Sequence, residues 1–430
     1  MRRNTNIQKP GHTMANSHHF STSRNRIAIV GGGSAGISVA SSLLARNRDL
    51  EIAIIEPSDV HYYQPGWTMV GGGIFQIADT SRPMAKMIPK GVERIHGRVV
   101  SFDPTNDRVM LEDGSALSYD RLIVCPGLKL NWQGVEGLSD TLGANGVTSN
   151  YRPDLAPYTW NLVQELKSGH AVFTQPPMPI KCAGAPQKAM YLSADYWRSR
   201  GRLKNISIDF CNAGGVLFGV PDYIPALMEY VKRYNANLRF GETLVRVDGP
   251  AKTAWFQKVG ADGSKVVTET KFDFLHVVPP QIAPDFIRES PLADQAGWMD
   301  VDQQLLRHKK YANIYGLGDV TNTPNAKTVA AVRKQAPIVA HNLLSDLGRS
   351  RGTAIYDGYG ACPLTVERGK IVLAEFGYGG KLCPTFPTTF IKGTTPTRAA
   401  WFLKAHVLPP VYWKWMLRGR EWLAKPVLKA

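Results

Sequence analysis

The sequence predicts an α/β protein with two Rossmann-like dinucleotide-binding domains and a C-terminal amphipathic region that binds a membrane surface. Three observations lead to this prediction. A glycine cluster follows a short apolar run near the N-terminus, a second strand–helix unit begins at His170, and residues 391–430 are basic and rich in tryptophan. At 430 residues, the chain is long enough for two or three domains that each bury a core.

The first predicted unit begins with the stretch Ile27–Gly36, which reads IAIVGGGSAG. The apolar run has the length of one buried strand, and Ile37–Leu44 continues as a helix. Gly31, Gly33 and Gly36 have the GxGxxG spacing, which permits a tight turn, close approach of a pyrophosphate to the backbone and close packing of the helix on the strand. The N-terminus of the helix then faces the phosphates.

A second strand supports the same interpretation. Residues Ile52–Ile55 are apolar and end at Glu56, twenty residues after Gly36. A carboxylate in this place accepts hydrogen bonds from a ribose 2′-hydroxyl and repels a 2′-phosphate. We therefore predict an adenine dinucleotide here. The alternative is a glycine-rich turn in an ordinary βαβ unit. Further strands are predicted near residues 94–102, 108–111 and 119–127, and the last of them closes the first domain.

The second strand–helix unit lacks a phosphate-binding turn. Its strand, His170–Thr174, is followed by a proline-rich stretch where a nicotinamide-binding domain would have a second GxGxxG. Proline has no backbone N–H, so a pyrophosphate finds no cradle there. Cys182 takes this place, at the start of a helix predicted over Gln187–Trp197.

A second fingerprint of a flavin-binding domain lies far along the chain. Residues Tyr311–Asp319, YANIYGLGD, form an apolar strand that ends in Gly318 and Asp319. In two-domain flavoproteins such an aspartate binds the ribityl chain, and the following helix, here predicted over Lys327–Leu347, directs its N-terminus at the isoalloxazine. The two fingerprints together favour FAD over NAD, in the fold of the FAD/NAD(P)-linked reductases.

The net charge of +16, from 51 Lys and Arg against 35 Asp and Glu, predicts an anionic surface as partner. The chain carries no zinc-finger, basic-zipper or RNA-binding signature, so we expect no nucleic acid. Residues 391–430 instead carry eight Lys or Arg and a single acid, Glu421, between tryptophans. This composition predicts a monotopic membrane anchor, divided by Pro409 and Pro410 into two short helices. The alternative is a C-terminal hairpin for dimerisation or domain docking.

No run of residues is long and apolar enough to cross a bilayer, and no secretory signal is predicted. The acid-free N-terminus is compatible with a mitochondrial presequence or with a disordered bacterial extension. We therefore divide the chain into a disordered or targeting extension (1–24), a discontinuous FAD-binding domain (25–150 and 298–350), a second Rossmann-like domain without a nicotinamide fingerprint (151–297) and a C-terminal region with a catalytic loop and membrane anchor (351–430).

Two of the five cysteines are candidates for chemistry. Cys182 should have a lowered pKa because a helix N-terminus and Lys181 both stabilise a thiolate. Cys362 lies in a glycine-rich loop before Pro363. Two thiols beside a flavin without a nicotinamide partner suggest a redox dithiol that delivers electrons to FAD. Buried inert thiols are the alternative, and they are our prediction for the remaining three, which show neither disulfide nor metal-ligand spacing: Cys125, Cys211 and Cys383.

Several segments share a pattern with one flavoprotein family. They are Gly31–Gly36 with Glu56, Tyr63–Trp67, Ile180–Lys188, Gly318 and Asp319 with Lys327, and Tyr356–Pro363. Together they resemble sulfide:quinone oxidoreductases, in the branch that includes the mitochondrial enzyme. The resemblance covers nearly everything after residue 24, and the KCAGAPQK segment around Cys182 is its most specific part.

The resemblance implies an enzyme that oxidises hydrogen sulfide through the pair Cys182 and Cys362 and through FAD. It implies transfer of the sulfane sulfur to a small acceptor such as glutathione, sulfite or sulfide, and reduction of ubiquinone. Ser149 or a neighbour stands where the bacterial branch has a third cysteine, which implies a two-cysteine mechanism. The residues that it implies as FAD contacts are Ser34, Ala35, Glu56, Gln64, Val99, Asp319 and Lys327.

The implied location is the surface of a bacterial cytoplasmic membrane or of the mitochondrial inner membrane, and a homo-oligomer is left open. We expect deletion of residues 391–430 to release the protein from membranes while sulfide still reduces the flavin. Two alternatives remain at this point: a type II NADH:quinone dehydrogenase, which shares the fold and a membrane tail, and a non-enzymatic flavin-binding sulfide sensor.

Overall fold

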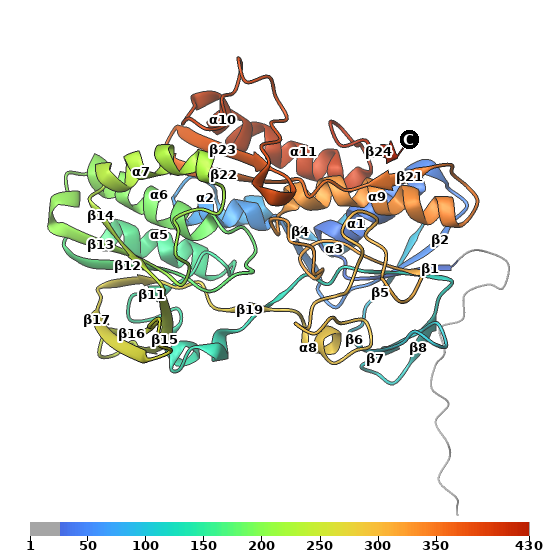
Figure 1. The fold of residues 1–430 in the computed structure, drawn as a ribbon, viewed down its shortest axis with the longest axis horizontal. Helices are drawn as coiled ribbons and strands as arrows, with labels where there is room; N and C mark the ends of the chain where they lie inside the picture. The colour runs from blue at the N-terminus through green and yellow to red at the C-terminus, as the bar shows by residue number, and fades with distance from the viewer. Residues whose placement is uncertain (1–25, 430) are drawn as a thin grey trace, which may run out of the picture.

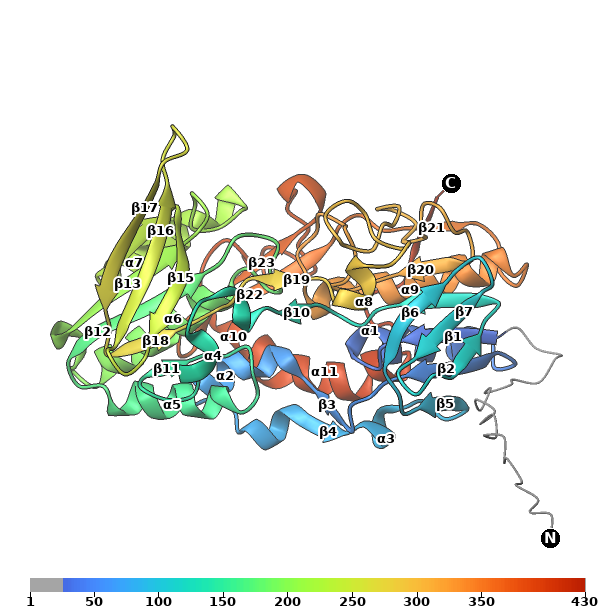
Figure 2. The ribbon, with the colours of Figure 1, turned by 90° about the horizontal axis from the view of Figure 1, so that it is seen from below.

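The computed structural model describes residues 26–429, so the extension assigned to residues 1–24 lies outside the described residues. Figure 1 shows two lobes side by side, each built on a parallel sheet, with the C-terminal segment lying across both. Figure 2 shows the same lobes from below, joined by the strands β10 (Lys129–Leu130) and β19 (Gln281–Ile282). The α/β prediction with two Rossmann-like domains is confirmed.

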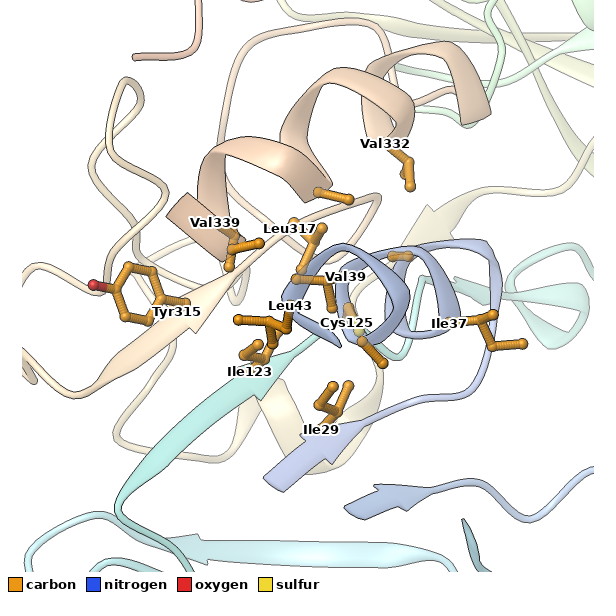
Figure 3. Packing of buried hydrophobic residues seen from close by; sticks show 14 of the residues in the cluster. Ile29, Ile37, Val39, Leu43, Ile123, Cys125, Tyr315, Leu317, Val332 and Val339 are labelled. Carbon is orange, nitrogen blue, oxygen red and sulfur yellow. The ribbon is translucent and has the colours of Figure 1, made fainter. Parts of the chain in front are cut away.

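The first sheet is fully parallel and has the strand order β20-β9-β1-β2-β5. All its strands except the edge strand β5 are buried almost throughout, and they therefore read as apolar runs in the sequence. The helices α1 (Ser34–Arg46) and α9 (Val329–Asp346) pack together over one face, where Ile29, Leu43 and Val339 share a core (Figure 3). The strands are β1 (Arg26–Val30), β2 (Glu51–Ile55), β5 (Val92–Ile95), β9 (Arg121–Val124) and β20 (Ile314–Gly316).

The opposite face of this sheet is covered by a small antiparallel sheet and by α8 (Asp285–Arg288). The single strand predicted over residues 94–102 is in fact two strands in different sheets, because the chain turns at Gly97 after β5 and enters β6. The antiparallel sheet consists of β6 (Val99–Asp103), β7 (Arg108–Leu111) and β8 (Ala116–Ser118).

The second sheet is also parallel, in the order β11-β18-β12-β13-β14, and its other layer is the antiparallel sheet β15-β16-β17. The helices α5 (Leu155–Glu165), α6 (Ala185–Ser199) and α7 (Ile224–Arg233) belong to this lobe. Its strands are β11 (Val147–Thr148), β12 (Gly169–Gln175), β13 (Ile206–Asn212), β14 (Ala236–Phe240), β15 (Glu242–Asp248), β16 (Thr253–Val259), β17 (Lys265–Lys271) and β18 (Phe274–His276).

The chain passes from one lobe to the other at different residues from those that the sequence suggested. Strand β11 lies before residue 150, yet it pairs with β18 in the second sheet. Ala283, Ile287 and Leu292 lie before residue 298, yet they pack in the core of the first lobe. Both crossings are short irregular connections without periodicity, so no pattern in the sequence marks them.

The first lobe also sends a small element toward the second. The helix α2 (Trp67–Gly71) packs against α5 and α6, and Figure 2 shows α2 beside α5. Close packing here depends on a glycine, because a Cβ added at Gly72 would lie 2.7 Å from Leu192 Cδ1. The neighbouring short elements are β3 (Val60–Tyr62), β4 (Ser81–Pro83), α3 (Met84–Met87) and α4 (Leu138–Thr141).

The C-terminal region packs on both lobes. The hairpin of β22 (Gly360–Glu367) and β23 (Lys370–Phe376) lies on α6, and β21 (Thr353–Ile355) pairs with the last strand, β24 (Val427–Lys429). Between them runs one helical stretch, made of α10 (Arg398–Phe402), a π-helical turn at residues 403–407 and α11 (Leu408–Lys414).

The predicted break at Pro409 and Pro410 is therefore wrong. Both prolines lie in the first turn of α11, where the missing N–H groups cost little, and the helical backbone is accommodated by the preceding π-helical turn instead. None of the helices formed by residues 26–429 combines the length and the apolar character that crossing a bilayer requires.

Candidate active site

A cavity of about 200 Å³ lies between the two lobes and the C-terminal segment. Segments from distant parts of the chain line it, including the second fingerprint, the turn before α6 and the π-helical turn. Six of its lining residues carry the chemistry discussed below: Gln64, Cys182, Lys188, Asp319, Lys327 and Lys404.

The structure brings the two predicted cysteines together. The Sγ atoms of Cys182 and Cys362 are 3.4 Å apart, although the residues are 180 positions apart in the chain. Cys182 lies in the turn between β12 and α6, with φ of +54°, and its backbone N–H donates to Lys327 O at 2.8 Å. A Cβ added at Gly184 would lie 2.5 Å from Cys362 Sγ, so only glycine lets the two segments approach this closely.

The sequence suggested that Cys362 lies in a glycine-rich loop, but the structure differs. Cys362 lies in β22 and is only 2% exposed, because residues on both sides of it pair with β23. The glycines before it, at positions 358 and 360, end the preceding connection rather than loosen the cysteine. The second sulfur is thus held in place by a strand, while the first lies on a strained turn.

The pKa values of the two thiols are shifted in opposite directions, which gives the thiols different roles. A hydrogen bond from the Cys362 thiol lowers the pKa of Cys182 well below its usual value, and the Lys188 ammonium adds to this effect. The same hydrogen bond, together with burial, raises the pKa of Cys362 well above its usual value. Cys182 is therefore the thiolate and Cys362 the thiol that donates to it.

The lysine that contacts the thiolate is Lys188, not the predicted Lys181. Lys188 Nζ lies 3.2 Å from Cys182 Sγ and the residue is buried, since Lys188 stands on the first turn of α6 and points back along it. Lys181 Nζ instead donates to Gln64 Oε1 at 2.5 Å. Lys188 is part of the KCAGAPQK segment, so the sequence contained it, but only the helical geometry shows which lysine reaches the sulfur.

Lys404 is a functional candidate that the sequence analysis missed. We counted it among the cations of the membrane anchor, yet it is 3% exposed and its Nζ donates to Pro65 O at 2.9 Å inside the cavity. Burial and the neighbouring Lys188 ammonium lower the pKa of Lys404 to about 7. Its charge also contributes to the low pKa of Cys182. No pattern in the basic tail distinguishes this lysine from the others.

The glycine turn has the shape that a dinucleotide needs. A Cβ added at Gly36 would lie 1.9 Å from Gly31 O, so the helix can approach the strand only with glycine there. A Cβ added at Gly33 would meet no atom within 4 Å, which leaves its face open to a ligand. The first turn of α1, with Ser34 and Ala35, has no side-chain cap and no acidic residue, and its N–H groups suit a pyrophosphate.

The remaining predicted contacts lie around this turn and the cavity. Glu56 directly follows β2, and its Oε2 accepts from Gly32 N at 2.7 Å, which fixes the carboxylate beside the turn. A Cβ added at Gly318 would lie 3.4 Å from Ala35 Cβ, so the two fingerprints meet in space. Val99, in contrast, packs in the core of the first lobe.

Asp319, Lys327 and Gln64 line the cavity itself. Burial raises the pKa of Asp319 and lowers the pKa of Lys327 to about 8. Lys327 Nζ donates to Thr321 O at 2.7 Å. Three buried residues in the same wall keep polar side-chain atoms without a hydrogen-bond partner among the described residues, namely Trp67, Thr68 and Asn150. Unsatisfied polar atoms in a cavity wall suit a polar ligand, so this set of residues fits FAD.

Comparisons with known proteins show which family the chain resembles. Residues 25–163 match the family described as pyridine nucleotide-disulphide oxidoreductase. The chain is 42% identical to "Sulfide:quinone oxidoreductase, mitochondrial" of Dictyostelium discoideum, over 94% of this chain and 88% of that protein. It is 37% identical to the protein of the same name from Mus musculus, over 91% of this chain and 86% of that protein.

Among solved structures, the sulfide:quinone oxidoreductase of the bacterium Aquifex aeolicus superimposes with a TM-score of 0.75 at 20% identity, with 92% of each chain covered. This similarity supports the fold alone, whereas the identity to the curated relatives extends over most of the sequence. On that identity, the chain belongs to the sulfide:quinone oxidoreductase family.

Proposed function

We propose that this protein is an FAD-dependent sulfide:quinone oxidoreductase in which Cys182 and Cys362 react with hydrogen sulfide. The observation that carries the proposal is the sulfur pair, 3.4 Å apart, of which Cys182 lies in the same cavity wall as the residues that fit FAD and Cys362 is buried beside it. The sulfane sulfur passes to a small acceptor such as glutathione, sulfite or sulfide, and ubiquinone takes the electrons.

The reaction begins from the oxidised pair, in which the two sulfurs are bonded at about 2.05 Å. Hydrosulfide attacks one sulfur, the S–S bond breaks, and the attacked cysteine becomes a persulfide while the other leaves as a thiolate. The sulfur with the lower pKa leaves faster. Because Cys182 has the lowered pKa, we infer that hydrosulfide attacks Cys362 and that Cys182 is the leaving thiolate.

The outer sulfur of the persulfide then passes to a nucleophilic acceptor, which leaves the two cysteines as a thiol and a thiolate, as in this structure. Re-forming the disulfide releases two electrons, and the cysteines lose their remaining proton. FAD, held by residues that include Gln64, Asp319 and Lys327, would supply the acceptor for these two electrons and their transfer to quinone. The ammonium groups of Lys188 and Lys404 stabilise the negative charge that stays on Cys182 between these steps.

The position of β22 argues against NADH as the electron donor. In a nicotinamide-binding unit, the pyrophosphate would lie at the N-terminus of α6. Here the hairpin lies on α6, and Cys362 and Leu364 come so close that a Cβ at Gly184 would lie 2.5 Å from either side chain. The N-terminus of this helix therefore serves the cysteine pair.

Anaerobic titration of the purified, FAD-loaded protein tests this assignment. We expect stoichiometric sulfide to bleach the flavin absorbance and an equal amount of NADH to leave it unchanged, because the NADH site is covered. Bleaching by NADH would instead favour a type II NADH:quinone dehydrogenase. A flavin that stays oxidised with both reagents would favour a sulfide sensor.

The C-terminal segment supplies an apolar side to the cavity that suits a quinone ring. Leu403, Leu408, Val411 and Met416 line it from this segment, and Phe386 from the loop before it. We infer that ubiquinone enters along these residues and meets the flavin near Lys327.

The same region presents apolar side chains to the outside. Phe390 is 70% exposed and Phe402 is 60% exposed, and Lys392 and Arg398 lie between them in the sequence. Exposed aromatic residues with neighbouring cations suit the headgroup layer of a membrane. We infer peripheral binding to the mitochondrial inner membrane or a bacterial cytoplasmic membrane through this loop and α10, where a lipid-soluble quinone is available.

Replacing both Phe390 and Phe402 by serine is expected to move most of the protein from the membrane pellet to the supernatant in a vesicle sedimentation assay, while sulfide still bleaches the flavin. A matched control replaces Val266 and Val267, which are 56% and 51% exposed on β17, and should sediment like the natural protein. Unchanged sedimentation of the Phe390 and Phe402 variant would contradict the proposed surface.

A further inference from the structure

The dinucleotide-binding turn of the first lobe is in contact with a tyrosine from the far end of the chain. Tyr412 lies on α11 and is 2% exposed. Its Oη lies 2.7 Å from Oγ of Ser34, the first residue of α1, and 2.6 Å from Nε2 of His61. Its ring packs on Tyr63, with 4.8 Å between the ring centroids. A residue of the C-terminal segment thus touches the phosphate-binding end of α1.

The hydrogen bonds at this contact have a defined direction. His61 Nδ1 lies 3.2 Å from Gly32 O, and a carbonyl oxygen can only accept, so Nδ1 carries the proton. Burial lowers the pKa of His61 to about 4, which keeps the ring neutral, and Nε2 must then accept from the Tyr412 hydroxyl. The Tyr412 oxygen in turn accepts from the Ser34 hydroxyl.

This chain of hydrogen bonds ties both sides of the glycine turn. Gly32 O is held from one side through His61, and Ser34 from the other through Tyr412. Helix α1 has no side-chain cap, so the backbone N–H groups of its first turn remain for a phosphate. Glu56 accepts from Gly32 N at 2.7 Å, so the same peptide segment also positions the carboxylate proposed to bind the ribose.

The segment after Tyr412 is fastened along α1, which fixes the tyrosine. Ser41 Oγ donates to Leu417 O at 2.9 Å, and Arg46 donates to Glu421 Oε2 at 2.7 Å. A Cβ added at Gly419, with φ of +70°, would lie 2.6 Å from Ser41 O, so glycine is needed for this close contact. Helix α1 and the C-terminal segment therefore pack together as one unit.

We propose that Tyr412 and His61 are positioning residues for the cofactor, and that residues 412–421 form part of the dinucleotide-binding site in addition to any role at the membrane. The proposal rests on FAD as cofactor but not on sulfide or quinone as substrates. It replaces the expectation that residues 391–430 can be deleted without loss of the flavin, because deletion also removes Tyr412 and the residues that cover α1.

The test is the rate at which the FAD-loaded protein releases flavin after dilution, followed by the rise in flavin fluorescence. Tyr412→Phe keeps the ring packing and removes the hydroxyl that links Ser34 to His61. We expect release to become about tenfold faster, which is the effect of losing one or two buried hydrogen bonds. Ser34→Ala should give a similar increase, and the double variant should be less than additive because both changes break the same link.

Tyr378→Phe is the matched control, because it removes a hydroxyl that donates to Gln303 O at 2.7 Å away from the turn, and its release rate should stay unchanged. A release rate in Tyr412→Phe equal to that of the natural protein would overturn the proposal. If Tyr412→Phe does not fold, an unchanged rate in Ser34→Ala overturns it equally. Sulfide bleaching of the flavin that remains bound is measured separately, so failure of this inference is distinct from failure of the proposed function.

Discussion

Replacing either Cys182 or Cys362 by serine is expected to lower sulfide-dependent quinone reduction by a thousandfold or more, on the order seen when one member of a catalytic unit is lost. The sulfurs lie 3.4 Å apart and form one disulfide in the proposed cycle, so neither can work alone. The double variant should be no worse than the single ones. Activity is measured as quinone absorbance in the presence of sulfide, and bound flavin is quantified in every variant.

The other three cysteines provide the controls. Burial raises the pKa of Cys125, Cys211 and Cys383, so they are thiols at neutral pH, and their serine variants should keep most of the activity. Full activity in Cys362→Ser with flavin bound would break the two-cysteine mechanism. A large loss of activity in Cys211→Ser, with flavin retained, would show that a cysteine outside this pair takes part in the reaction.

Lys188→Met is expected to lower the activity at pH 7 by tenfold or more, through the pKa of Cys182. Lys188 Nζ lies 3.2 Å from the Cys182 sulfur, and its positive charge favours the thiolate. Removing that charge raises the pKa of Cys182, and each unit by which this pKa exceeds the solution pH lowers the thiolate fraction about tenfold. Methionine keeps the length and packing of the buried side chain.

The pH dependence of alkylation separates this effect from a loss of structure. In the natural protein, the rate at which a small haloacetamide modifies Cys182 should rise at lower pH than the rate for an ordinary thiol, because the pKa of Cys182 is lowered. In Lys188→Met the same rise should move to higher pH. Lys204→Met, which changes an exposed lysine of the same lobe, should behave like the natural protein. An unchanged alkylation profile in Lys188→Met would show that the hydrogen bond from Cys362 and the other cations lower the pKa of Cys182 without Lys188.

Local sequence patterns predict much of the fold. The glycine spacing before α1, Glu56 at the end of β2 and the Gly318–Asp319 fingerprint each depend on a few neighbouring residues, and they predict the first sheet and its ligand. Cys182 was predictable for the same reason, because it interrupts a familiar strand–helix unit. Cys362 was a candidate only as a thiol in a glycine-rich segment, because nothing in that segment places it on a strand beside α6.

The residues that the sequence did not reveal are those that act across long separations. Lys404 and Tyr412 looked like ordinary members of a basic, aromatic tail, yet tertiary packing buries both beside the active site and the glycine turn. The choice of Lys188 over Lys181 depends on which way the side chains project from the turn into α6. Periodicity and composition describe surfaces and cannot assign such contacts.

The order of these segments along the chain has a consequence for folding. The thiolate at Cys182 depends first on a hydrogen bond from Cys362, which lies 180 residues away in the chain. Until β22 packs on α6, Cys182 therefore lacks the partner that lowers its pKa most, and a larger share of it is the less reactive thiol. The face of α1 that Leu417 and Glu421 cover also stays open until the C-terminal segment packs on it, so a flavin can reach the glycine turn before that contact forms.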